Sequence, residues 1–267
     1  LKLAQASAKN GDTRAAVIVG KIYADGRVVK QNYAMAAKWY HFAGTRGNAE
    51  GSFNLAILYV NGRGTKKHYP RAAQWFERAA RTGHVLANYN LGLLFLSGKG
   101  KPENPIRAHL HIRYAAQNNI PAAQYDLATL YQKGHGVEAD AYLASLWLRR
   151  AAEQGMGEAQ FEYAVTLLKG HGINADVPKA MDYLRQAAAK GIAGAQNRLA
   201  HALFAGRLIK KDLKAAAKWR LLARGAGLPD EAFDKRLAKL PKKIRQAAIR
   251  EAAIWRERVR LSVKVAD

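Results

Sequence analysis

Cysteine is absent from this chain of 267 residues. Disulfide scaffolds, thiolate zinc sites, iron–sulfur centres and cysteine nucleophiles are therefore excluded. The compartment stays open, because a reducing cytosol and an oxidising periplasm both tolerate a cysteine-free protein. Long apolar runs are also missing: none approaches the ~20 residues that a membrane helix needs. We predict no transmembrane segment in this piece.

Acidic residues are scarce, at 20 against 44 lysines and arginines, which gives a formal net charge of +24. The excess is uneven. Residues 1–125 hold 18 basic and 5 acidic side chains, residues 126–192 hold 7 and 8, and residues 193–267 hold 19 and 7. The chain thus has two basic ends and a neutral middle, a distribution that favours an anionic partner or serves solubility.

Catalytic signatures are missing as well. No serine lies in a nucleophile elbow, and there is no H-E-x-x-H motif, Walker loop or dinucleotide fingerprint. His109 and His111 lie two residues apart, so on a helix they diverge too far to chelate one ion. We predict no enzymatic activity, no cofactor and no metal. His135 and His171 are the best candidates for pH sensing, although ordinary solvated histidines remain the favoured interpretation.

A period of 36 residues dominates what the chain does contain. One glycine column consists of Gly26, Gly62, Gly98, Gly134, Gly170 and Gly206. Two alanine columns consist of Ala36, Ala72, Ala108, Ala144, Ala180 and Ala216, and of Ala43, Ala79, Ala115, Ala151, Ala187 and Ala223. Six units without an insertion are strong evidence for a repeat protein, in which each unit buries its apolar face against its neighbours.

Each period is predicted to form two helices. In the second period, Leu55, Leu58 and Tyr59 have the i, i+3, i+4 spacing of one helical face, and Gly62 follows where the chain must leave that helix. The segment 65–83 then repeats alanine and aromatic residues at helical intervals. Small residues in pairs allow two helix backbones to approach closely.

The pattern A-x-x-x-L-[GA]-x-x-Y-x-x-G-x-G, followed by A-x-x-W-x-x-x-A-A-x-x-G, resembles the Sel1-like repeat, a relative of the tetratricopeptide repeat. The fourth unit matches it through Ala123, Leu127, Ala128, Tyr131, Gly134, Gly136, Ala144, Trp147, Ala151, Ala152 and Gly155. The resemblance implies an all-α fold, a right-handed α-solenoid of six 36-residue helix pairs. It also implies a non-enzymatic scaffold or adaptor of bacterial origin, often exported.

Three segments of the chain are expected. Residues 1–10 are predicted to be the second helix of a truncated preceding repeat, because Leu3 lies 36 residues before Trp39. Residues 11–228 form the six-unit solenoid. After Leu228 the period is predicted to stop, and residues 229–267 form C-terminal capping helices in which Trp255 docks on the sixth unit.

A concave groove lined by the first helix of each unit is the leading candidate site. Its predicted partner-binding residues are Phe53, Asn54, Ile57, Tyr89, Asn90, Leu93, Tyr125 and Phe161. These side chains either hold a partner helix or peptide, with the asparagine amides pairing its backbone, or pack between neighbouring first helices. Both interpretations stay open from the sequence.

A ladder of basic or titratable residues follows the first loop glycine of every unit. It consists of Arg27, Arg63, Lys99, His135, His171 and Arg207. The ladder either tracks an anionic partner or consists of solvated loop residues.

The predicted function is protein–protein interaction through the groove, with a protein partner that carries an acidic or amphipathic segment. The alternative is an anionic polymer, either an envelope glycan or, less favoured, a nucleic acid, because the apolar groove lacks a base-reading column. The resemblance favours the periplasm or cell envelope, with the cytoplasm as the alternative.

Overall fold

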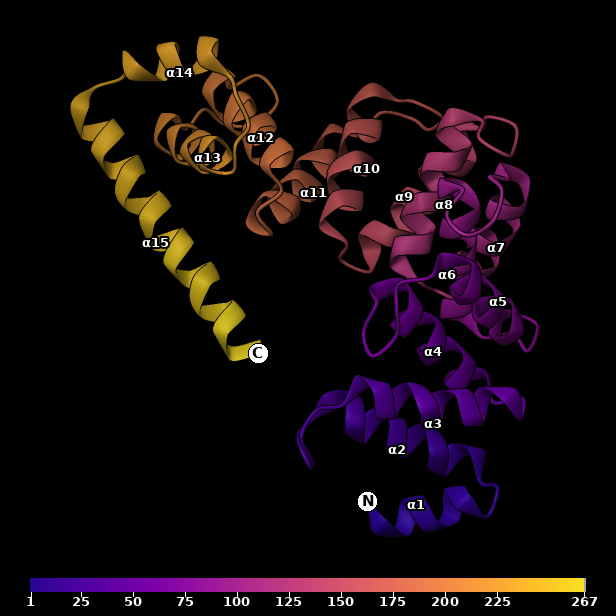
Figure 1. The fold of residues 1–267 in the computed structure, drawn as a ribbon. Coiled ribbons are helices and arrows are strands. Elements are labelled where there is room, and N and C mark those ends of the chain that lie inside the picture. The colour runs from indigo at the N-terminus through magenta and orange to yellow at the C-terminus, as the bar shows by residue number, and fades with distance from the viewer. Residues whose placement is uncertain (267) are drawn as a thin grey trace. The chain divides into compact units, whose positions relative to one another are not determined.

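The computed structural model describes residues 1–266, and in this range the chain forms fifteen helices and no strand (Figure 1). The all-α fold predicted from the sequence is confirmed. The first helices of the six repeats are α2 (Thr13–Asp25), α4 (Ala49–Asn61), α6 (Val85–Ser97), α8 (Pro121–Lys133), α10 (Gly157–Lys169) and α12 (Ala193–Ala205). The second helices are α3 (Tyr33–Thr45), α5 (Tyr69–Ala80), α7 (Pro105–Gln117), α9 (Ala141–Glu153), α11 (Val177–Ala189) and α13 (Leu213–Gly225). The remaining helices are α1 (Lys2–Lys9), α14 (Glu231–Ala238) and α15 (Lys242–Ala266).

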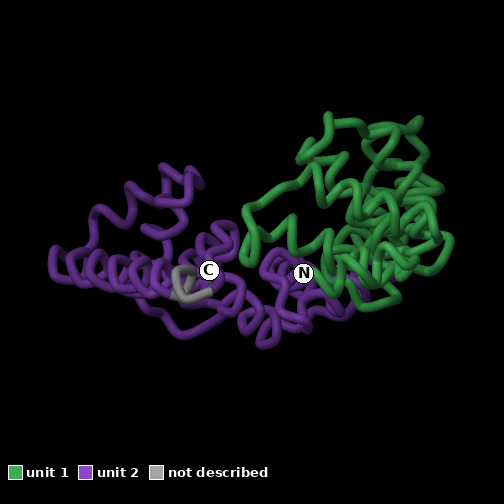
Figure 2. The backbone as a smooth tube through the Cα atoms, turned by 60° about the horizontal axis from the view of Figure 1, so that its bottom comes forward, with its two compact units in different colours: residues 1–140 green, residues 141–267 purple. Residues whose placement is uncertain are grey.

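The helices gather into two compact units, an N-terminal unit, Leu1–Asp140, and a C-terminal unit, Ala141–Asp267 (Figure 2). The first contains α1 to α8 and the second contains α9 to α15. The boundary falls in the loop of the fourth repeat. The domain limits predicted from the sequence, at residues 10 and 228, stay predictions.

Every first helix ends on the glycine of the 36-residue column. These six glycines have φ between 64° and 71°, the left-handed conformation in which a side chain would be strained. The loop then folds back onto the first helix. Near its end each first helix has an aromatic residue or a leucine, and the residue nine positions later donates its backbone N–H to the carbonyl of that aromatic residue or leucine. Asn32 bonds to Tyr23 in this way at 2.8 Å, and Asp212 bonds to Leu203 at 3.0 Å.

The same returning residue caps the second helix. Asn32 accepts a hydrogen bond from the backbone N–H of Met35, and Asp212 accepts one from Ala215. Asparagine and aspartate are favoured at this position because their side chains satisfy backbone donors that have no partner in the helix. The capping column also contains His68, Asn104 and Asp176. Its 36-residue spacing is a signal that the sequence analysis did not use.

The alanine columns lie in the packed core. Members of the first column are 0–2% exposed, and members of the second are completely buried. Larger side chains fill the space around them: Trp147 is 7% exposed and Tyr131 is 8% exposed. Both aromatic residues of the repeat pattern are thus part of the core.

The second loop glycine joins neighbouring repeats. A Cβ on Gly64 would lie well inside van der Waals contact with the backbone of Tyr33, the first residue of α3. The same clash would arise between Gly136 and Pro105. The loops after α4 and α8 thus pack against the start of the second helix of the preceding repeat, α3 and α7. Only glycine, which has no side chain, fits at these contacts.

The C-terminal helices close the last repeat. Trp255 of α15 packs edge-on against Trp219 of α13, with ring centroids 6.3 Å apart, which confirms the expected docking. Phe233 of α14 is 1% exposed. Within the predicted cap, Phe233 follows Asn197, and Trp255 follows Trp219, at the spacing of 36 residues.

Candidate partner-binding site

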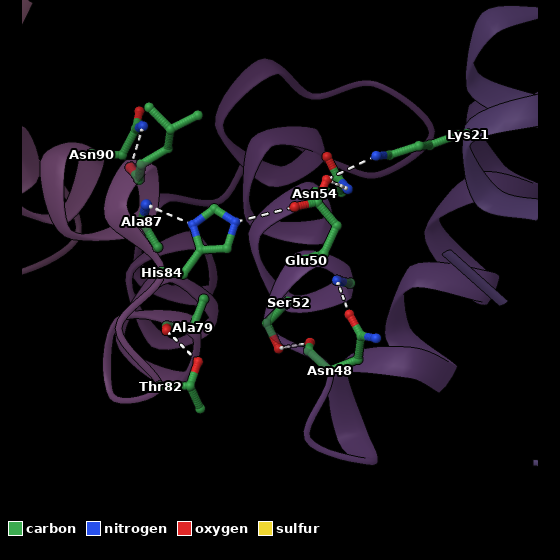
Figure 3. A network of polar contacts seen from close by, with 12 residues as sticks. Lys21, Asn48, Glu50, Ser52, Asn54, Ala79, Thr82, His84, Ala87 and Asn90 are labelled. Carbon is green, nitrogen blue, oxygen red and sulfur yellow. Dashed lines mark hydrogen bonds and ion pairs between the residues drawn. The ribbon is translucent and has the colours of Figure 1, made fainter. Parts of the chain in front are cut away.

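Polar contacts connect successive first helices in the N-terminal unit (Figure 3). The carboxylate of Glu50 in α4 lies 3.0 Å from Lys21 Nζ in α2 and 3.2 Å from Nε2 of His84, the N-cap of α6. Asn54 donates to the same carboxylate at 3.0 Å. Burial acts to raise the pKa of Glu50, but the hydrogen bonds from Lys21 and His84 outweigh it, and the pKa falls below its ordinary value. These contacts link three successive first helices, α2, α4 and α6.

The predicted groove residues are all half-buried. Phe53 stacks on the His84 imidazole with ring centroids 4.6 Å apart and also contacts Phe76 at 5.8 Å. Asn90 donates to the carbonyl of Leu86 in its own helix at 2.8 Å. The side chains therefore pack between repeats and still keep some of their surface open.

Tyr89 shows how the packing proceeds from α6 to α8. Its hydroxyl donates to Oδ2 of Asp126 at 2.8 Å. Burial raises the pKa of Asp126, and the hydrogen bond from Tyr89 opposes that rise. Burial also raises the pKa of Tyr89, with the Asp126 charge as a second cause. Tyr125, one residue before this aspartate, is half-buried.

A cavity of about 470 Å³ opens in the N-terminal unit, lined by residues of α4, α5, α6 and the loop after α6. Its lining brings together Asn90 and Leu93, predicted for the groove, and Lys99, predicted for the loop ladder. The complete lining consists of Val60, Tyr69, Phe76, Asn90, Leu93, Leu94, Leu96, Ser97 and Lys99. Residues of the groove and of the ladder, treated separately in the sequence analysis, thus line one cavity here.

A second cavity, of about 630 Å³, lies in the C-terminal unit. It contains the groove residue Phe161 and the ladder residue Arg207. Leu168, Leu184, Arg198, His201, Ala202, Ala205 and Arg207 here occupy the repeat positions of Val60, Phe76, Asn90, Leu93, Leu94, Ser97 and Lys99 in the first cavity. Cavities of this kind are therefore a property of the repeat, with linings that differ in size and charge.

The ladder residues are not equivalent. Arg27, Arg63 and Lys99 are all exposed, but Arg63 and Lys99 also lie over tyrosine rings, at 5.5 Å from Tyr33 and 5.8 Å from Tyr69. Nε2 of His135 lies 3.8 Å from Glu103 in the N-terminal unit.

The other predicted loop histidine, His171, belongs to the C-terminal unit, where its carbonyl accepts a hydrogen bond from Ser145. Burial, followed by the Arg113 charge, lowers the pKa of His109, which is 6% exposed.

Among residues 1–266 there is no group of three histidine, aspartate or glutamate side chains that could hold a metal ion. No helix in the described range of the chain is long and apolar enough to cross a membrane.

Several residues of the site were missed from the sequence. Arg198 lies in the repeat column of Asn54 and Asn90, so extending that column would have found it. Glu50 and His84 could not be found in this way. They contact each other from different positions of the 36-residue period, so no column of the repeat contains both.

Paired helices at a constant period, with cavities along the first helices, define an α-solenoid repeat protein. The chain belongs to the Sel1 repeat family, whose model matches residues 13–48, 49–84, 85–120, 121–156, 157–192 and 193–224. The resemblance found in the sequence is thereby confirmed. Sel1 repeat proteins generally mediate protein–protein interactions, and the family typically provides non-catalytic scaffolds.

Two solved structures are similar to the chain along most of its length. One is c5321 of uropathogenic Escherichia coli, a protective antigen displaying an SLR fold, with a TM-score of 0.84 and 25% identity over 94% of this chain. The chain spans 55% of that protein. The other is a Sel1 repeat protein from Oxalobacter formigenes, with a TM-score of 0.70 and 30% identity over 79% of this chain and 85% of that one. No curated protein matches the chain.

Proposed function

We propose that this protein is a non-enzymatic scaffold that binds a segment of a partner protein along its first helices. One observation carries the proposal: apolar groove side chains and a basic loop residue line the same cavity, as Leu93 and Lys99 do. An apolar cavity with a few polar groups at its border is the usual form of a binding site.

The half-burial of the groove's aromatic residues, Phe53, Tyr89, Tyr125 and Phe161, supports this proposal. Phe53 is held against His84, so it needs little further ordering when a partner covers its remaining surface. A rigid ring in a partly desolvated setting is the kind of residue on which binding energy concentrates.

Site-specific photo-crosslinking tests the proposal. A photoreactive amino acid at Ile57, a residue of the predicted groove, or at Leu93 in the cavity lining should capture a partner in cells, whereas the same group at exposed Arg81, outside both sets, should not. Leu93→Glu should abolish capture from position 57 without changing the thermal melt. Equal capture from positions 57 and 81 would contradict the proposal.

The cell envelope or periplasm is the proposed compartment. The similarity to a protein described as a protective antigen supports it, together with the bacterial source of both neighbours. Fractionation of cells that express the full-length gene tests it: the protein should separate with the periplasmic or membrane fraction and not with a cytoplasmic marker.

A further inference from the structure

The cavity of the C-terminal unit has apolar walls built from α10, α11, α12 and the following loop. They consist of Phe161, Leu168, Met181, Leu184, Ala202 and Leu208. A volume of about 630 Å³ is within the range of small-ligand sites and is ample for a large apolar side chain.

This cavity is larger than its counterpart and has smaller side chains at some of the equivalent positions. Ala202 stands where the N-terminal unit has Leu94, and Ala205 stands where it has Ser97. Gly194 admits the Phe161 ring, because a Cβ there would lie 2.8 Å from Phe161 Cζ.

Charge distinguishes the two cavities more sharply. Arg198 and Arg207 line this one and are exposed, and neither side chain makes an ion pair or hydrogen bond within the residues that the structure describes. His201, also in the lining, is already paired with Asp230 at 2.7 Å. Two unpaired guanidinium groups beside an apolar cavity are complementary to a carboxylate attached to an apolar group.

We infer that this cavity binds one apolar side chain of a partner segment, with a carboxylate next to it held by Arg198 and Arg207. The carboxylate is supplied by an aspartate or glutamate side chain or by the end of the partner chain. The inference rests on the proposed function and states the chemistry of the segment that the C-terminal unit recognises. The basic surroundings of residues 193–267 steer such a segment toward the cavity.

Selection of random dodecapeptides on the purified protein tests the inference. Retained peptides should share a large apolar residue with a carboxylate within one or two positions. Fluorescence anisotropy of one labelled peptide then compares three proteins: Ala205→Trp, which fills the cavity; Arg198→Glu with Arg207→Glu; and Lys235→Glu with Arg250→Glu, a matched control outside the cavity lining.

The first two variants should weaken binding about tenfold or more, and the control should stay within about twofold of the parent. Circular dichroism melts should coincide for all three. Amidating the peptide's end, and separately replacing its acidic side chains by amides, identifies the source of the carboxylate.

Other outcomes overturn the inference. If retained peptides bind the cavity variants normally but fail on Leu93→Glu, the inference is wrong and the proposed function stands. If no peptide is retained, both fail. If no peptide is retained but dodecanoate binds and Ala205→Trp abolishes that binding, the cavity holds a lipid-like anion instead.

Discussion

Arg220 and Asp234 form a bidentate ion pair that joins α13 to α14. Nε and Nη2 of the arginine lie 2.8 Å and 2.9 Å from the two carboxylate oxygens. The Arg220 side chain is only 1% exposed, and it also donates to the carbonyl of Leu228 at 2.9 Å. Removing one partner would leave a buried charge without its counter-ion, which costs far more than an exposed pair is worth.

Asp234→Ala should therefore lower the free energy of unfolding by about 3 kcal/mol. Urea titration followed by tryptophan fluorescence measures the loss, since Trp219 and Trp255 pack in the same unit. Asp182→Ala is the control, because its pair with Arg185 is exposed, and it should cost less than about 1 kcal/mol. Equal losses for the two variants would mean that Asp234 adds no more than a surface charge.

Trp147→Ala should cost about 3–5 kcal/mol, because the substitution deletes a large buried side chain and leaves a cavity. Tyr142 in the same helix is 60% exposed, so Tyr142→Ala should change the unfolding free energy little. Denaturant melts of both variants decide the matter. A loss below about 1 kcal/mol for Trp147→Ala would show that the repeat tolerates an empty aromatic position.

Gly64→Ala and Gly47→Ala should differ although both glycines have positive φ, 67° and 89°. Alanine at Gly47 meets open space, so only the left-handed backbone costs energy, about 1 kcal/mol. Alanine at Gly64 would in addition collide with the backbone of Tyr33 and push the two adjoining repeats apart. Thermal melts should therefore show a clearly larger loss for Gly64→Ala; similar melts would mean that the loop moves away freely.

The C-terminal cap should weaken in acid through Asp230. Hydrogen bonds from His201 and then Asn197 lower its pKa to about 2, from an ordinary value of 3.8. A lowered pKa in the folded state gives stability that is present above about pH 4 and is lost as the pH falls through about 2.

Asp230→Asn keeps the N-cap but removes the charge. The stability difference between parent and variant should be largest above about pH 4 and vanish near pH 2. Urea midpoints at a series of pH values measure it, and a constant difference would contradict the assigned cause.

The alternative of an anionic polymer on the loop ladder has its own test. Changing Arg27, Arg63, Lys99 and Arg207 together to glutamine should flatten the salt dependence of retention on heparin, because fewer counterions are released. Glutamine at Arg14, Arg81, Arg113 and Arg250, four exposed arginines outside these loops, is the matched control. The same slope for both variants would remove the ladder as a specific polyanion site.

The repeat made most of the fold predictable. Helix ends follow from Gly26 and its equivalents, and close helix contacts follow from the alanine columns, because each depends on one residue type at one position. The chain of contacts from Lys21 through Glu50 to His84 could not be predicted, since it joins three different repeat positions and depends on the spacing between helices.

The candidate site was predictable in its components but not in its assembly. Leu93 and Lys99 were both singled out, yet the loop that carries Lys99 returns toward α6 only in three dimensions. The larger cavity near Phe161 depends on Gly194, Ala202 and Ala205 acting together. All three residues lie in α12, but no repeat column marks them as the residues that leave room beside Phe161.

The turns at Gly47 and Gly227, where a side chain would meet nothing within 4 Å, differ from the packed loops at Gly64 and Gly136. The connections of the array are therefore of two kinds: loops that pack against the preceding repeat, and turns whose glycine faces open space. Foreign sequence threaded into an open turn, such as an epitope or a fluorescent reporter, would leave the stacking of helices untouched. A tag at Gly47 therefore gives a handle for following the protein in cells, whereas a tag of the same length at Gly64 would separate the repeats.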